Sequence, residues 1–211
     1  MINLNSNTAK GILVVLLSFA IFASNGINIH QIVGGKAGGE ISKTNSSIRW
    51  GLSAIKAPEA WEVTKGSEEV VVAVIDSGID GSIPSLRGKM WTNNDEKPND
   101  GIDNDNNGYV DDYHGWDFRD NDNSAASGSR LYPHGTFVAG IIGSSFDRRN
   151  LSGGVAPNIS IMDIRFLNSE GLFYTNDWNK LIDSFQYAIE NGADIINFSV
   201  YASVAIPQQV R

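Results

Sequence analysis

The chain alternates between short apolar runs and longer amphipathic stretches. Residues 70–75 form an apolar run with four valines, and two further stretches rich in apolar residues lie at 159–167 and 193–200. Runs of this length and composition predict strands that are buried on both faces, as in a parallel sheet. Over 177–190 the apolar residues recur at intervals of three and four positions, which predicts an amphipathic helix ended by an Asn-Gly pair.

Two further helices are predicted by other local signals. Residues 136–142, which follow His134, are apolar nearly all round, and such a stretch predicts a buried helix. Pro58 favours a helix start, with Trp61 as its apolar anchor. The strand–helix–strand order predicts an α/β fold, a parallel β-sheet flanked by helices on both faces.

The amino-terminal region has the pattern of an export signal. Lys10 precedes 13 uncharged, mostly apolar residues and then a small-x-small sequence. We therefore predict a signal peptide over 1–26 and a secreted, extracellular protein. An uncleaved anchor is the alternative, but a membrane span needs about 20 residues, so we expect no stable membrane insertion after cleavage. Residues 27–47 are predicted to be a linker or a remnant propeptide, and 48–211 the folded domain.

Composition and charge narrow the classes of function. The 211 residues suffice for one core of ordinary size, and the absence of cysteine excludes disulfides and thiolate metal sites. The net charge of −8 comes entirely from residues 93–123, which hold ten acidic and two basic residues. Because the chain has no basic patch, nucleic acid is not an expected partner.

Asp76 and His134 are the first candidates for chemistry. Asp76 follows a predicted strand directly, and open α/β sheets place their sites at the carboxyl ends of strands. A carboxylate that accepts a hydrogen bond from one imidazole nitrogen fixes the tautomer and leaves the other nitrogen free as a base. The helix amino end at His134 also disfavours a permanent positive charge. The alternatives are a turn-initiating aspartate and a structural histidine.

Five stretches resemble one protein family and occur in its order. "VVVAVIDSGID" and "HGTFVAG" resemble the Asp and His motifs of the subtilisin-like serine proteases, the subtilases. "WGLSAIKAPEAW", "GGVAP" and "GADIINFS" resemble the start of the mature domain, a turn and the substrate-groove strand of that family. The resemblance implies a serine endopeptidase that acts on proteins or peptides through an Asp–His–Ser triad. It implies Asp76 as the orienting acid, His134 as the general base and 48–211 as a partial catalytic domain.

Two features depart from the family pattern. The Gly-Thr-Ser sequence that carries the family's nucleophile does not occur in the 211 residues, so the chain as written is predicted to be inactive. On the groove strand the resemblance implies Ser199 and Val200 as substrate-binding residues, but Tyr201 and Ala202 stand where the family has glycines. Either the pocket is altered, or the true sequence is lost after about Val200, as a frameshift or an incomplete reading would cause.

The acidic segment contains half of a calcium-loop motif. Asp103, Asp105 and Asn107 occupy alternate positions before a glycine, so their oxygens can converge on one cation. The predicted ligands of a structural calcium are Asp103, Asp105, Asn107, the Tyr109 carbonyl and Asp112. A complete EF-hand is not expected, because its twelfth position is a histidine. Many secreted subtilases carry a similar loop here; the alternative is a solvated acidic loop.

Two other classes of function remain open. The first is a non-catalytic, calcium-binding extracellular protein that retains part of the subtilase fold. The second is a cofactor-binding α/β module, which is disfavoured because the glycines of "GGKAGG" follow no strand and lack the dinucleotide-binding spacing.

Overall fold

The computed structural model describes residues 13–15, 50–147, 153–174 and 176–200. Its centre is a parallel five-stranded sheet with the order β1-β5-β2-β4-β3. The strands are β1 (Leu13–Val15), β2 (Val71–Asp76), β3 (Gly115–Asp117), β4 (Ser160–Arg165) and β5 (Ile195–Asn197).

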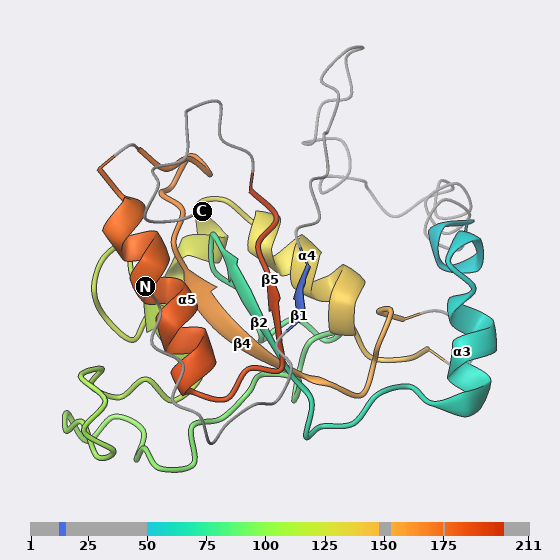
Figure 1. Ribbon diagram of the computed structural model, residues 1–211, viewed down its shortest axis with the longest axis horizontal. Helices are drawn as coiled ribbons and strands as arrows, with labels where there is room; N and C mark the ends of the chain where they lie inside the picture. Colours follow the sequence, from blue (N-terminus) through green and yellow to red (C-terminus); the bar gives the residue numbers. More distant parts are fainter. Residues whose placement is uncertain (1–12, 16–49, 148–152, 175, 201–211) are drawn as a thin grey trace.

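Helices cover both faces of this sheet. Helix α4 (His134–Gly143) and helix α5 (Trp178–Glu190) lie on opposite sides of β2 and β4 in Figure 1. Helix α3 (Ala57–Val63) lies apart from the sheet, and a 3-10 helix η1 (Ala125–Arg130) precedes α4. The predicted α/β architecture is therefore confirmed. Within the described ranges no helix is long and apolar enough to cross a membrane.

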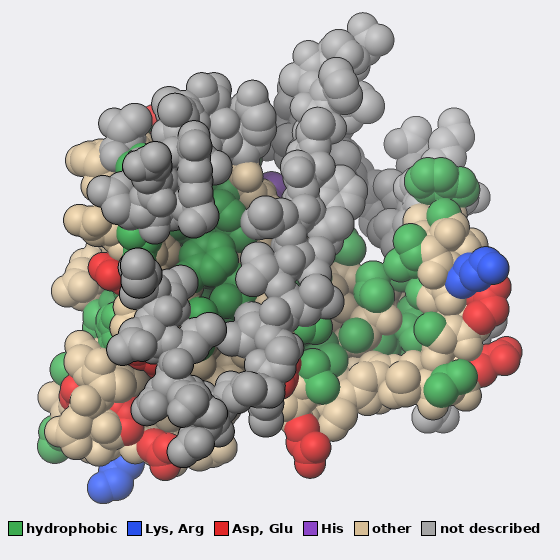
Figure 2. Space-filling model, in the orientation of Figure 1, with side chains coloured by type: hydrophobic (Ala, Val, Ile, Leu, Met, Phe, Trp, Pro, Cys, Tyr) green, Lys and Arg blue, Asp and Glu red, His purple; other side chains and the backbone are tan. Residues whose placement is uncertain are grey.

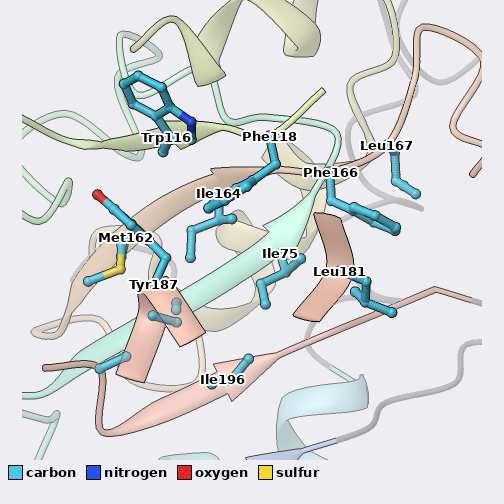
Figure 3. Close-up of a cluster of buried hydrophobic side chains, with 13 residues drawn as sticks. Ile75, Trp116, Phe118, Met162, Ile164, Phe166, Leu167, Leu181, Tyr187 and Ile196 are labelled. Atoms are coloured by element: carbon cyan, nitrogen blue, oxygen red, sulfur yellow. The ribbon is translucent and has the colours of Figure 1, made fainter. Parts of the chain in front are cut away.

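The larger core lies between the sheet and α5. Apolar side chains from β2, β4 and β5 pack there against Leu181, Tyr187 and Ala188, the buried face of the amphipathic helix (Figure 3). Burial of such side chains contributes roughly 1.5–3 kcal/mol each to folding. The predicted 177–190 helix is thus formed for the expected reason, with its apolar stripe on the sheet.

A smaller core lies under α4. Val72, Val74 and Ile161 point from the sheet toward Ala139, which is fully buried. A third apolar cluster packs α3 against the segment that follows α4. In it, Trp61 packs edge-on against Phe146 at a centroid distance of 5.0 Å. Apolar side chains of α3 outside this cluster are exposed, and apolar side chains are visible along α3 in Figure 2.

The order of the strands fixes where a site can form. From β2 the chain reaches β3 at one edge of the sheet, returns through α4 to β4, and then crosses through α5 to β5 on the other side of β2. Strand β2 therefore lies between β4 and β5, and open α/β sheets bind ligands at the carboxyl ends of their strands. Asp76 is the last residue of β2.

Part of the predicted amino-terminal signal falls within the described residues. Leu13–Val15 forms β1, which pairs in parallel with β5. The segment 27–47, predicted as a linker or remnant propeptide, lies outside the described residues.

Candidate active site

The end of β2 and the start of α4 bring Asp76 and His134 into contact. His134 Nδ1 lies 2.9 Å from each carboxylate oxygen of Asp76. The aspartate is fully buried, whereas the histidine side chain keeps 25% of its surface exposed. Because an ionised carboxylate only accepts hydrogen bonds, Nδ1 carries the proton and Nε2 is left free. The structure therefore brings the two predicted site residues into contact.

Ser77 connects the acid to the segment that carries the base. Its backbone N–H donates to Asp76 Oδ1 at 2.7 Å, and its hydroxyl donates to the Tyr132 carbonyl at 2.7 Å. The same hydroxyl accepts the N–H of Gly135 at 3.0 Å. A Cβ on Gly135 would lie 2.6 Å from the Gly78 carbonyl, so only glycine lets α4 begin this close to the turn after Asp76.

The carboxylate determines the basicity of the imidazole. The hydrogen bond that His134 donates to Asp76 raises the pKa of His134, and this effect outweighs the opposing effect of burial. The helix amino end was expected to favour the neutral form, but the carboxylate is the stronger influence on the pKa. Tyr132 stacks on His134 with ring planes 21° apart and centroids at 5.9 Å.

Ser199 and Val200, which were predicted to bind substrate, lie at the same edge of the sheet. Strand β5 pairs with β2 with Asn197 opposite Val74, so Ser199 follows β5 on the side where β2 ends at Asp76. The Ser199 hydroxyl is 3.0 Å from Asn197 Nδ2, and Val200 packs against the larger core. Tyr201 and Ala202, where the sequence departs from the family pattern, lie outside the described residues.

The acidic loop between β2 and β3 brings three carboxylates together. Oxygens of Glu96, Asp105 and Asp112 all lie within 4.8 Å of one another. Glu96 is 95% buried, and its Oε2 has no hydrogen-bond partner in the described part of the chain. Glu96 and Asp112 are buried and Asp105 is half-buried. Burial of carboxylates is costly without a positive charge, so this donor set fits a hard cation with oxygen ligands. Acidic side chains of the region appear at the lower left of Figure 2.

The predicted calcium ligands divide into two groups. Asp105 and Asp112 belong to the carboxylate cluster, and Asn107 Nδ2 lies 3.1 Å from a carboxylate oxygen of each. Asp103 instead accepts the backbone N–H groups of Asn107 and Gly108 and shapes the turn. The Tyr109 ring packs against Trp116, Phe118 and Tyr187, which anchors the loop to the core.

Glu96 was missed by the sequence reasoning. It stands outside the alternating aspartates, and no spacing rule connects it with Asp105. The loop folds back because Glu96 Oε1 accepts the N–H groups of Asn104 and Asp105, at 2.6 and 3.3 Å. Asn93 was also missed, although its Nδ2 bridges Asp105 and Asp112. The weak signal was the acidic and amide-rich composition of the segment before the motif.

A buried aspartate in contact with a partly exposed histidine, at the carboxyl edge of a parallel sheet, is an arrangement that serine-hydrolase sites also have. Comparison with known proteins gives the family. The Subtilase family profile matches residues 67–208, and the chain belongs to the subtilase family. The predicted resemblance is thereby confirmed.

Curated relatives match over most of this chain. Thermitase of Thermoactinomyces vulgaris is 30% identical, with 75% of this chain and 47% of the relative covered. A thermophilic serine proteinase of Bacillus sp. (strain AK1) is 34% identical over 67% of this chain and 28% of its own. The major intracellular serine protease of Bacillus subtilis (strain 168) is 30% identical, with 75% and 42% covered.

A solved structure agrees at the level of the fold. The crystal structure of MycP1 with its propeptide removed matches with a TM-score of 0.50 and 24% identity, over 75% of this chain and 41% of that one. The chain thus spans less than half the length of the relatives named here.

Proposed function

We propose that this protein is the acid–base part of a subtilase that hydrolyses peptide bonds in proteins or peptides. The observation that carries the proposal is the contact of His134 Nδ1 with both oxygens of the buried Asp76. In this arrangement Nε2 takes the proton of an attacking serine hydroxyl, and the Asp76 carboxylate stabilises the imidazolium that forms. The serine is proposed to come from a Gly-Thr-Ser segment, which residues 1–211 do not contain.

Hydrolysis of casein and of chromogenic peptides tests this function. We expect residues 1–211 to be silent and a version extended through a Gly-Thr-Ser segment encoded downstream to be active. Loss of the nucleophile or the base lowers turnover by roughly a million-fold in such triads, so His134→Ala should silence the extended protein. Hydrolysis by residues 1–211 that disappears in their His134→Ala form would show that the nucleophile lies within them.

We further propose a structural calcium held by Glu96, Asp105 and Asp112. The support is the convergence of three carboxylates around an unpartnered, buried Glu96 oxygen. Calcium should bind in preference to magnesium, because magnesium demands near-ideal octahedral geometry at shorter distances.

Calorimetry on the folded protein decides between the two sets of ligands. Glu96→Gln should abolish calcium binding. Asp103→Asn is the control, because Asp103 accepts backbone N–H groups of the turn, and this variant should retain most of the calcium binding. The reverse order would favour the ligands predicted from the motif over the cluster. A protein that binds calcium and remains inactive even when extended would support the non-catalytic alternative.

Export is also a proposal, supported by the apolar pattern of residues 1–26. The relatives include proteases described as intracellular, so family membership alone does not decide the compartment. Sequencing the amino terminus of the protein from culture medium is the test. Cleavage after Gly26 would remove β1 from the edge of β5, and an intact amino terminus found only in cells would contradict export.

A further inference from the structure

The carboxyl ends of β2, β4 and β3 place three charged residues in one row. Asp76 is the register partner of Arg165, and Arg165 is the register partner of Asp117. Register partners on neighbouring strands project to the same face of a sheet. The buried Arg165 side chain therefore leaves the sheet between two buried aspartates. One of them, Asp76, also binds His134.

Arg165 is turned away from Asp76. Its Nη1 lies 2.6 Å from Asp117 Oδ2 and 2.5 Å from Asp120 Oδ2. Its Nε is buried and has no hydrogen-bond partner among the described residues. A Cβ on Gly128 would lie 2.4 Å from this Nε and 2.2 Å from the Ser77 carbonyl, so the Arg165 side chain runs beside the residue that follows Asp76.

An arginine free to reach Asp76 would compete with the imidazole. A guanidinium is permanently charged and can donate two parallel hydrogen bonds to a carboxylate. His134 offers Asp76 a single N–H donor. The orientation of the base therefore depends on where the guanidinium is held.

We propose that Asp117 is a positioning residue that holds Arg165 away from Asp76 and so reserves the Asp76 carboxylate for His134. The inference rests on the proposed role of His134 as the base. Asp117 is suited to this task because it is fully buried and its Oδ1 accepts the N–H groups of Arg119 and Asp120. These two bonds fix the carboxylate with Oδ2 directed at Arg165.

A double-mutant cycle on the full chain, read by NMR titration of the His134 ring, tests the proposal. Asn at position 117 can still accept both backbone N–H groups through Oδ1, but its amide would present a donor to the guanidinium. In Asp117→Asn we expect the His134 midpoint to fall and the Nδ1 proton signal to weaken. In the double variant Asp117→Asn/Arg165→Met, the His134 midpoint and the Nδ1 proton signal should equal those of Arg165→Met alone, because no competing guanidinium remains.

The cycle separates repositioning from a long-range charge effect. If Arg165 stays in place, the two substitutions change the His134 midpoint additively, and the proposal is overturned. An unchanged midpoint in Asp117→Asn also overturns it, for instance if the freed guanidinium turns to Asp163, which lies two residues earlier on β4.

A second cycle covers the case in which Asp117→Asn fails to fold. Asp120, whose side chain is 55% exposed, is the other anchor of Arg165. Asp120→Asn should lower the His134 midpoint relative to the wild type, and Asp120→Asn/Arg165→Met should have the same midpoint as Arg165→Met alone. Since every readout is a titration and none is hydrolysis, the result stands apart from whether the protein is a peptidase.

Discussion

Replacement of Asp163 by asparagine should stabilise the protein, and increasingly so as the pH rises. Asp163 lies in the middle of β4 with 3% of its surface exposed, beside a cavity of about 630 Å³. Its Oδ2 accepts the N–H of Ile79 at 3.1 Å, and its Oδ1 has no partner among the described residues. An amide keeps the acceptor for Ile79 and carries no charge.

The size of this effect on the free energy of unfolding follows from the protonation of the Asp163 carboxyl. Burial, with smaller contributions from Asp117 and Asp76, raises the pKa of Asp163 from 3.8 to about 8. Between these values the unfolded chain has released the proton and the folded protein retains it, so stability falls as pH rises, by about 1.4 kcal/mol per pH unit. Over about four units the loss approaches 6 kcal/mol; it is absent below pH 4 and constant above pH 8.

Urea denaturation followed by circular dichroism at pH 5, 7 and 9 measures this dependence. The wild-type protein should lose stability across the series, and Asp163→Asn should lose much less. Asp183→Asn, an exposed change on α5, is the matched control and should follow the wild type. Parallel pH profiles for wild type and Asp163→Asn, or a variant less stable than wild type at pH 9, would refute the reasoning.

Three further predictions concern the site and its supports. Asp76→Asn should lower the pKa of His134 toward its ordinary value, because the raising bond is weakened, and NMR titration measures it. Gly115→Ala should cost about 3 kcal/mol in urea denaturation, since its Cβ would meet the Asp163 carbonyl at 1.8 Å and the backbone φ is +135°. Tyr187→Phe removes the 2.7 Å bond to Asp112 and should weaken calcium binding about tenfold in calorimetry.

The sequence predicted those elements whose signal is local. The apolar run at 70–75 and the stripe over 177–190 lie within one residue or so of β2 and α5, because each contains its own periodicity. Strand β3 was not predicted. It has three residues beginning with a glycine, and it is a strand because β4 offers it a paired edge.

The candidate site shows the same division. Asp76 and His134 were predictable because each marks the end of an element with a strong local pattern, and the sheet order brings those ends together. Glu96 and Asp117 were not, because their partners depend on how the 93–123 loop folds back on itself and on β4. The composition shows that this loop is acidic, but it does not predict which carboxylate binds which cation.

The turn after Asp76 explains how the two side chains meet. Gly135 allows α4 to start against the Gly78 carbonyl, and the Ser77 hydroxyl joins the two segments at that point. These contacts fix where α4 begins, and with it the position of His134. Under our proposal the buried ion pair of Asp117 and Arg165 then decides whether the Asp76 carboxylate is available to the imidazole. The turn after β2 thus places the histidine, and the proposed role of the ion pair of β3 and β4 is to keep its partner available.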